Sequence, residues 1–200
     1  VKYILEQNKK AKLENTPQRE KEGDKNKNDV SHASWYDAGK WLVGEKGQDK
    51  IHIQRGNESI HLQVMNNEHI AGGTSVYEVI NQYQVFSSEG QVDSRNRRFD
   101  VTLLINGIPM IHIELKNKEH SYMDGYRQIK KYIAEGKFRG LFSNVQMFVV
   151  SNAVDTKYFA AARDIELNKK FITGWIDKEN QTVCDYIEFC KAVLRIPKAH

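Results

Sequence analysis

The ionisable side chains of residues 97–116, RRFDVTLLINGIPMIHIELK, have the types and spacing of a metal-assisted hydrolytic site. The segment reads as two strands that meet at a turn containing Asn106 and Gly107. From Phe99 onward the odd positions are apolar apart from Gly107, whereas Asp100, Glu114 and Lys116 fall at even positions. Because side chains alternate between the two faces of a strand, the apolar residues should form one buried face and the ionisable groups should share the other.

The turn must agree with this alternation. A two-residue Asn-Gly turn would place Asp100 opposite Ile113, on the apolar face. A three-residue loop over 105–107 places Asp100 opposite His112 and keeps even positions facing even positions. The pattern therefore predicts a type I turn followed by a bulge, with Gly107 in the left-handed conformation.

In that register Glu114 is the diagonal neighbour of Asp100, so two carboxylates can share one cation. Hard oxygen ligands suit Mg²⁺, and the backbone carbonyl of Leu115 could supply a third oxygen. Lys116 can position or activate the attacking water and offset developing negative charge. His112 shares this face and is interpreted as a bystander rather than a ligand. Asp100 with Glu114 and Lys116 indicates metal-assisted phosphodiester hydrolysis, although Glu-x-Lys alone is more often an exposed, ion-paired strand edge.

Positive charge is concentrated around the same segment. Residues 95–139 contain ten basic and five acidic side chains, an excess of five, while the whole chain carries a net charge of +4. A basic field around a few acids is typical of a site that holds a polyanion and a metal. A solvated surface of mixed charge is the alternative. The candidate DNA-binding side chains are Arg97, Arg98, Lys118, Arg127, Lys130 and Lys131.

The remaining elements indicate an α/β or α+β domain with a mixed central sheet flanked by helices. Residues 51–65 predict a hairpin around Arg55-Gly56-Asn57, and 76–86 and 171–176 predict strands. A helix is expected over about 122–134, with a Ser121–Asp124 capping pair and Gly136 as its stop. Residues 145–151 predict a central buried strand, and 182–195 a C-terminal helix that leaves Cys184 and Cys190 as core thiols.

The sequence argues against a nucleotide-binding loop and against a membrane span. The spacing of Gly39, Gly44 and Gly47 is similar to a phosphate loop, but no Lys directly follows Gly44, so this loop should not bind ATP. No run of 18 apolar residues exists, so no membrane span is expected. Two cysteines cannot make a disulfide framework, which favours a reducing, cytoplasmic setting.

The segment RFDVTLLINGIPMIHIELK resembles the PD-(D/E)xK nuclease core, specifically the form in the restriction subunit of type I restriction-modification enzymes. Phe99 stands where the family has its proline. Gln128-Ile-Lys-Lys-Tyr132 matches the Q-x-x-x-Y motif that follows this core, and residues 80–85 and 141–159 resemble the flanking strands. The resemblance covers roughly residues 76–195, and residues 1–75 match poorly. An acidic helix residue that many such nucleases carry is not placed there, and Glu6 or Glu14 are only guesses.

The resemblance implies a Mg²⁺-dependent endonuclease domain that cuts double-stranded DNA, in a fragment of a longer bacterial or archaeal chain. It implies a catalytic set of Asp100, Glu114, Lys116, Gln128 and Tyr132, with Gln128 supporting the metal or lysine and Tyr132 contacting phosphate. An amide and a phenol that cap the core edge are the alternative for that pair. Residues 1–34 would be a charged, partly flexible segment and 35–200 the endonuclease domain, with its core at about 76–160.

Partners also follow from the resemblance: modification and specificity subunits would choose the target, and an ATP-driven motor would follow residue 200. A related repair or junction nuclease, or a non-catalytic DNA-binding or docking module of the same fold, are the alternatives. The sequence leaves open the recognition sequence, the oligomeric state and whether this chain cleaves DNA in isolation.

Overall fold

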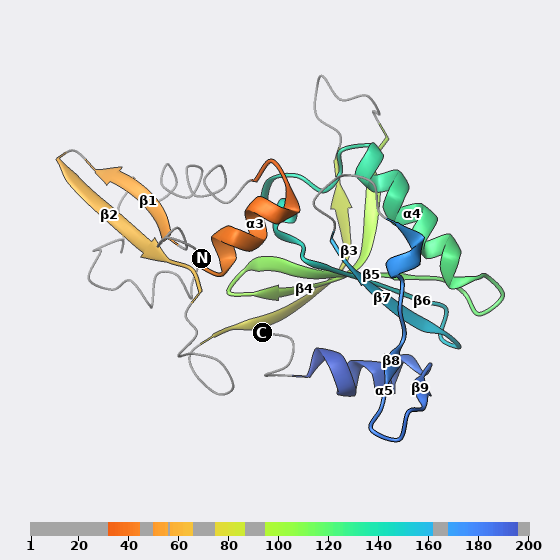
Figure 1. Cartoon of the computed structure of the whole chain (residues 1–200). Coiled ribbons are helices and arrows are strands. Elements are labelled where there is room, and N and C mark those ends of the chain that lie inside the picture. Colours follow the sequence, from red (N-terminus) through yellow and green to blue (C-terminus); the bar gives the residue numbers. More distant parts are fainter. Residues whose placement is uncertain are drawn as a thin grey trace.

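A computed structural model describes residues 32–44, 50–55, 57–65, 75–86, 95–161 and 168–195. The chain folds around a five-stranded sheet with helices on both faces (Figure 1). The sheet contains β3 (Tyr77–Val85), β4 (Arg97–Ile105), β5 (Ile108–Leu115), β6 (Met147–Ser151) and β7 (Thr156–Ala160), in that spatial order. The predicted mixed α/β architecture is confirmed.

The sheet is mixed because one connection crosses over its face. Strands β3, β4 and β5 form an antiparallel meander, and β7 returns antiparallel to β6. Strand β6 pairs parallel to β5, and the crossover between them carries helix α4 (Tyr122–Ala134) and the 3₁₀-helix η4 (Gly140–Asn144). Strand β6 is flanked on both sides and buried at Phe148 through Ser151, so the predicted central strand is confirmed.

The β4–β5 turn differs from the expected three-residue loop. Ile105 pairs with Ile108, and both Asn106 and Gly107 have positive φ, 55° and 83°, as a two-residue type I′ turn requires. Left-handed Gly107 is confirmed, but the loop length is wrong. The Asn106 side chain holds this turn: Oδ1 accepts from Val76 N (2.8 Å) and Nδ2 donates to Val64 O (3.0 Å).

A bulge inside the hairpin then restores the alternation that the short turn inverts. Leu104 pairs with Pro109 but Leu103 pairs with Ile111, so one extra residue lies in β5. Proline has no N–H to donate to the ladder and is tolerated at such a bulge. Thr102, not Asp100, therefore lies opposite His112, and the expected pairing of Asp100 with His112 is wrong. Beyond the bulge, even positions again face even positions, as Thr102 and His112 do.

The alternation predicted that the apolar residues of this hairpin share one buried face, and this expectation is wrong. Val101 and Leu103 pack with Ile111 and Ile113 in a cluster under the C-terminal helix, but Phe99 joins the cluster under α4. The β3–β4 ladder is interrupted between the pairs Asn81–Val101 and Tyr83–Phe99, at Gln82, which has φ +54°. The opposite face is also buried: Thr102, His112 and Glu114 lie under α4, whereas Leu115 is exposed.

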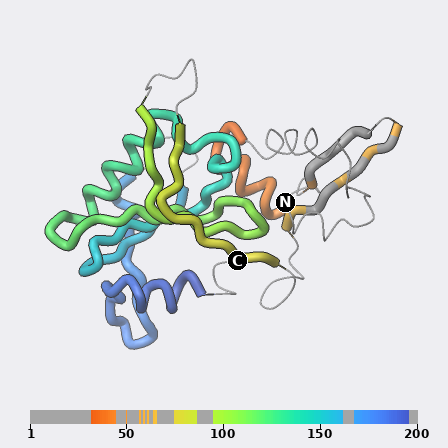
Figure 2. The backbone as a smooth tube through the Cα atoms, turned by 180° about the vertical axis from the view of Figure 1, so that it is seen from behind, coloured from red at the N-terminus to blue at the C-terminus, as the bar shows by residue number. Residues whose placement is uncertain are grey.

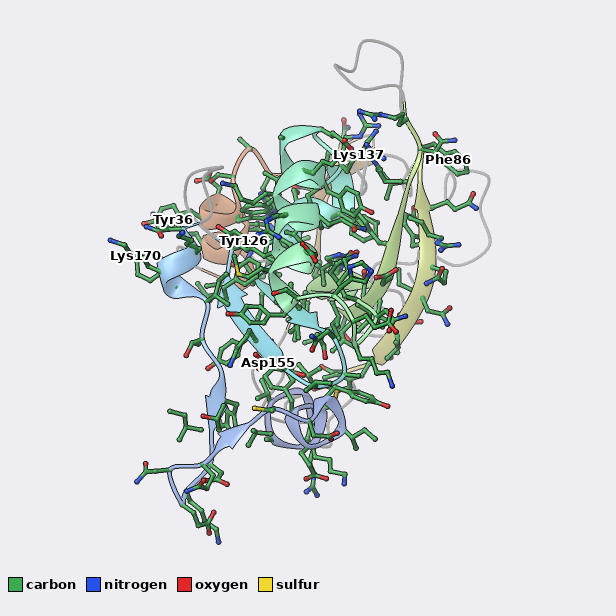
Figure 3. All side chains as sticks on the ribbon, turned by 90° about the vertical axis from the view of Figure 1, so that its right-hand side faces the viewer. Tyr36, Phe86, Tyr126, Lys137, Asp155 and Lys170 are labelled. Atoms are coloured by element: carbon green, nitrogen blue, oxygen red, sulfur yellow. The ribbon has the colours of Figure 1, made fainter. Side chains whose placement is uncertain are left out.

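Helix α4 runs over the predicted residues and covers one face of the sheet. Its apolar side chains, among them Tyr126 and Ile129, pack into the cluster between helix and sheet, where side chains crowd together (Figure 3). Ser121 Oγ accepts from Met123 N as the N-cap, and Gly136 ends the helix with φ +65°. The expected reciprocal cap is wrong, because the Asp124 carboxylate pairs with Arg127 instead.

The C-terminal region covers the other face of the sheet, as the view from behind shows (Figure 2). The expected strand 171–176 is reduced to β8 (Trp175–Ile176), because the 3₁₀-helix η5 (Lys169–Phe171) precedes it. The helix expected from residue 182 begins later: β9 (Thr182–Val183) precedes α5 (Tyr186–Phe189), and the π-helical turn η6 (Cys190–Leu194) follows. Phe189 takes the buried position, and both cysteines are exposed, so their assignment as core thiols is wrong.

Among the described residues before β3, the structure forms one helix and one hairpin. Helix α3 (Trp35–Leu42) begins at residue 35, the expected first residue of the endonuclease domain, and the predicted hairpin is confirmed as β1 (Lys50–Arg55) and β2 (Glu58–Gln63). Gly39 lies within α3. In the described ranges, no helix has the length and apolar character needed to cross a bilayer.

Candidate active site

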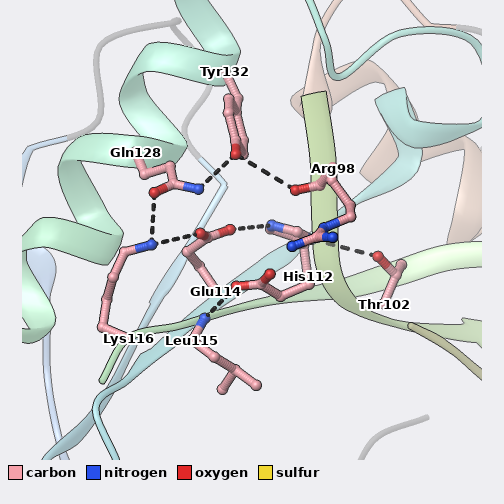
Figure 4. A network of polar contacts seen from close by, with 9 residues as sticks. Arg98, Thr102, His112, Glu114, Leu115, Lys116, Gln128 and Tyr132 are labelled. Atoms are coloured by element: carbon pink, nitrogen blue, oxygen red, sulfur yellow. Dashed lines mark hydrogen bonds and ion pairs between the residues drawn. The ribbon is translucent and has the colours of Figure 1, made fainter. Parts of the chain in front are cut away.

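A chain of polar contacts joins the end of β5 to one side of α4 (Figure 4). Lys116 Nζ donates to Glu114 Oε1 (2.9 Å) and to Gln128 Oε1 (2.6 Å). Gln128 Nε2 donates to Tyr132 OH (2.5 Å), and Tyr132 OH donates to the Arg98 carbonyl (3.5 Å). The four side chains expected to act together from these two elements therefore form one connected network.

Asp100 reaches the same place from β4. Its Oδ2 accepts from Leu115 N at 2.9 Å, so this carboxylate lies against the backbone that joins Glu114 to Lys116. The convergence of Asp100, Glu114 and Lys116 beside Gln128 is what the alternation along the hairpin predicts, although a different turn and a bulge produce it.

Glu114 is the buried centre of the network. Its side chain is fully buried, whereas that of Lys116 is 17% exposed, and Glu114 Oε2 has no hydrogen-bond partner. A buried carboxylate oxygen with unused lone pairs beside a second carboxylate fits a hard divalent cation. The described residues contain no group of three or more His, Cys, Asp or Glu side chains that could hold a metal. Mg²⁺ suits this smaller set, since it is commonly held by one or two carboxylates and keeps several waters.

A close helix–sheet approach brings Gln128 and Tyr132 over Glu114. Gly125 in α4 faces β6 so tightly that a Cβ there would lie 3.2 Å from Val150 Cγ1 and 3.6 Å from Glu114 Cγ. A larger residue would push α4 outward and lengthen the contact between Lys116 and Gln128. The small residue three positions before Gln128 is thus a functional signal that was missed from the sequence.

The basic residues are not equivalent. Arg97 forms an ion pair with Glu135, whose carboxylate accepts a hydrogen bond from Arg97 Nε at 2.6 Å. The Arg97 guanidinium also lies 5.9 Å from the Tyr132 ring centroid. Arg127, Lys130 and Lys131 are exposed on α4, and Arg98 and Lys118 are exposed near the ends of β4 and β5. Arg127 pairs with Asp124. Glu6 and Glu14 lie outside the described residues.

The phenol of Tyr132 makes the stability of the fold depend on pH in the alkaline range. Burial raises the pKa of Tyr132, and the negative charge of Glu114 raises this pKa further, against the hydrogen bond from Gln128. The folded protein therefore retains the phenol proton above pH 10, where an unfolded chain loses it. The resulting stabilisation is present below about pH 10 and is lost as the pH rises through the folded pKa.

We expect Tyr132→Phe to be less stable than the wild type by about 1 kcal/mol at pH 8, because a hydrogen bond is lost. This difference should shrink at pH 11, where only the wild type has this phenol to ionise. Urea unfolding of both proteins at the two pH values measures it, and a difference that grows with pH would contradict the assignment.

Comparison with known proteins shows which family the sequence matches. The family model described as the type I restriction enzyme R protein N terminus, HSDR_N, matches residues 3–166. The chain belongs to this family. The match begins at residue 3, so the expectation that residues 1–75 fall outside the resemblance is wrong.

Curated relatives carry the same kind of name. The chain is 30% identical over 193 residues to the endonuclease subunit of the type I restriction enzyme SauCOLORF180P of Staphylococcus aureus (strain COL), covering 96% of this chain and 19% of that subunit. It is 34% identical over 112 residues to the endonuclease subunit of type I restriction enzyme EcoprrI of Escherichia coli, covering 54% of this chain and 36% of the relative. The chain thus spans about a fifth of the length of its S. aureus relative.

Proposed function

We propose that this R-protein N terminus is a Mg²⁺-dependent endonuclease domain that hydrolyses phosphodiester bonds of double-stranded DNA. The observation that carries the proposal is Lys116, whose ammonium contacts both the buried Glu114 carboxylate and the Gln128 amide beside Asp100. A lysine that contacts a buried carboxylate and an amide, next to a second carboxylate at the end of a strand, is more specific than Glu-x-Lys alone. It favours a catalytic site over an ion-paired strand edge.

The residues of the site have different proposed roles, which follow from the chemistry of their side chains. Asp100 and Glu114, with the Leu115 carbonyl, would hold the cation, and Mg²⁺ when bound supplies a water of lowered pKa and offsets phosphate charge. Lys116 would orient the attacking water and stabilise the negative charge that develops on the phosphate. Gln128 fixes the lysine and Tyr132 fixes the amide of Gln128. The hydroxyl of Tyr132 would contact a phosphate oxygen of the DNA.

The remaining parts of the proposal concern the whole protein. Relatives are named as endonuclease subunits of type I restriction enzymes. We propose that modification and specificity subunits select the DNA and that an ATP-driven motor lies outside residues 1–200. A repair or junction nuclease would use the same site, and a non-catalytic DNA-binding module would retain the fold without cleavage.

Separate substitutions of Lys116 and Asp100 should divide cleavage from metal binding. Lys116→Ala should abolish cleavage while changing Mg²⁺ affinity by less than about threefold, because an ammonium has no lone pair to offer a metal. Asp100→Ala should lose both DNA cleavage and Mg²⁺ binding. Calorimetric Mg²⁺ titration and cleavage by the assembled restriction enzyme make the comparison.

Lys157→Ala is the matched control for Lys116→Ala. Lys157 is similarly buried, 20% against 17% exposed, and is ion-paired with Asp155 at 3.0 Å. The Lys157→Ala protein should retain wild-type DNA cleavage and Mg²⁺ affinity. Cleavage at the wild-type rate by Lys116→Ala would remove the lysine from the mechanism.

The exposed cations of α4 should contribute unequally to DNA binding. By helical geometry Lys131 and Arg127 lie about 60° and 100° from Gln128 on one side, whereas Lys130 lies about 160° away. Alanine at 127 or 131 should reduce the salt dependence of duplex binding by about one unit, as expected for one lost phosphate contact. Lys130→Ala shares the helix and charge change and should have the smallest effect.

Fluorescence anisotropy with duplex DNA across a salt series gives the slopes. Unchanged slopes in all three variants would move the DNA track to another surface.

A further inference from the structure

A buried histidine lies on the far side of Glu114 from Lys116. His112 is fully buried, and its ring lies among three phenylalanine rings, with centroid distances of 4.7 Å to Phe99, 5.3 Å to Phe138 and 6.2 Å to Phe148. These rings offer no hydrogen-bond acceptor to the imidazole nitrogens. His112 was interpreted as a bystander from the sequence, but in the described part of the chain two groups of matching chemistry lie beside its ring nitrogens.

Those neighbours are a hydroxyl and the central carboxylate of the site. His112 Nδ1 lies 3.4 Å from Thr102 Oγ1, and Nε2 lies 3.5 Å from Glu114 Oε2. Within the described part of the chain, Nε2 and Oε2 are both buried without a hydrogen-bond partner. Figure 4 shows Thr102, His112, Glu114 and Lys116 in one line of contacts. Two unsatisfied buried atoms that face each other need one proton between them.

The chemistry of the two neighbours determines where that proton lies. A carboxylate can only accept, so an unprotonated Nε2 would turn a lone pair toward the oxygen lone pairs of Glu114. The Thr102 hydroxyl can donate, so Nδ1 can be the acceptor. With Glu114 as a carboxylate and the imidazole neutral, the arrangement that gives each of these atoms a partner is Thr102 O–H to Nδ1 and Nε2–H to Glu114 Oε2.

We propose that His112 is a positioning residue that, as its Nε2–H tautomer, holds Glu114 in place for the reaction. Lys116 fixes Oε1 and His112 fixes Oε2, so the carboxylate plane is held from both sides. Oε2 keeps a second lone pair for the cation, because a carboxylate oxygen accepts more than one contact. This inference rests on the proposed nuclease function for its effect on activity, whereas the tautomer does not depend on that function.

The first experiment determines the tautomer without metal or DNA. Long-range ¹H–¹⁵N correlation spectra of the uniformly ¹⁵N-labelled chain at pH 7.5 distinguish protonated from unprotonated ring nitrogens. His112 should show a protonated Nε2 and an unprotonated Nδ1. The Nδ1–H tautomer, or a doubly protonated ring, would overturn the proposal.

The second experiment uses the reach of three side chains. Gln at position 112 can place an amide N–H near the position of Nε2, whereas Asn reaches only the position of Nδ1 and Leu has no donor. His112→Leu and His112→Asn should weaken Mg²⁺ binding and cleavage by about 10- to 100-fold, the usual effect of losing a group that orients a metal ligand. His112→Gln should stay within about threefold of the wild type in both.

The pattern across these variants separates positioning from packing. Thermal unfolding of each variant shows which proteins are folded, and the Gln–Asn comparison involves two amides of equal polarity. Equal losses in folded Gln and Asn variants, or wild-type Mg²⁺ affinity and cleavage in the Asn variant, would overturn the proposal. Failure of the wild type itself to cleave would instead contradict the proposed function, while the tautomer and Mg²⁺ affinities would still decide the role of His112.

Discussion

Glu114→Gln should reduce DNA cleavage by the assembled enzyme at least about 100-fold, the upper end of the loss seen when a group merely supports a metal ligand. Glutamine keeps the shape and an acceptor oxygen for Lys116, but it removes the charge that attracts the cation. DNA affinity measured in EDTA should stay equal or rise, because a buried carboxylate repels phosphate when no metal is bound. Single-turnover cleavage and anisotropy on the same preparation separate the two effects.

Glu119→Gln is the matched control for this substitution. It makes the same chemical change five residues along the chain, at an exposed position outside the described network. Its cleavage rate should equal that of the wild type. Wild-type cleavage by Glu114→Gln would end the catalytic assignment of this strand.

Phe148→Ala should have the largest effect on stability, about 3–5 kcal/mol. Phe148 is fully buried in β6, with ring centroids of Trp35, Phe138 and Phe159 at 5.4, 5.2 and 5.4 Å. Truncation leaves a cavity between α4 and the sheet that these large rings cannot fill. Because a domain of this kind is stable by about 5–15 kcal/mol, the loss is a large part of the total.

Phe171→Ala is the control for Phe148→Ala, because Phe171 is 74% exposed. It should change stability by less than about 0.5 kcal/mol. Urea unfolding of the chain gives both values, and similar losses in the two variants would contradict the packing around β6.

The alternation of residues predicted which side chains meet, but not how the backbone achieves it. Beyond the bulge, the even positions Thr102, His112 and Glu114 lie on the face under α4, as the alternation predicts from strand periodicity. The Asn-Gly dipeptide favoured a two-residue turn, and the alternation favoured three residues. The structure satisfies both, since a bulge next to Pro109 corrects the register. One proline within a strand was the available signal for that bulge.

Other differences arise from long-range contacts that a single sequence does not reveal. Phe99 and Val101 lie in different core clusters, on either side of the point where the β3–β4 ladder is interrupted at Gln82, whose positive φ is unusual for a non-glycine residue. The cysteines are exposed because Phe189, between them, occupies the core under the sheet. His112 was assigned no role because its partner Thr102 is ten residues away and becomes its neighbour only in the observed register.

Mg²⁺-dependent cleavage of supercoiled plasmid by the restriction enzyme containing this chain tests the proposed function most directly. Wild-type enzyme should nick or linearise the plasmid with Mg²⁺ and leave it supercoiled with EDTA, and Asp100→Ala enzyme should leave it supercoiled in both. The ATP that the motor is proposed to use is held constant across all arms. Cleavage that persists in EDTA, or with Asp100→Ala enzyme in Mg²⁺, would contradict a metal-dependent site at the end of β5.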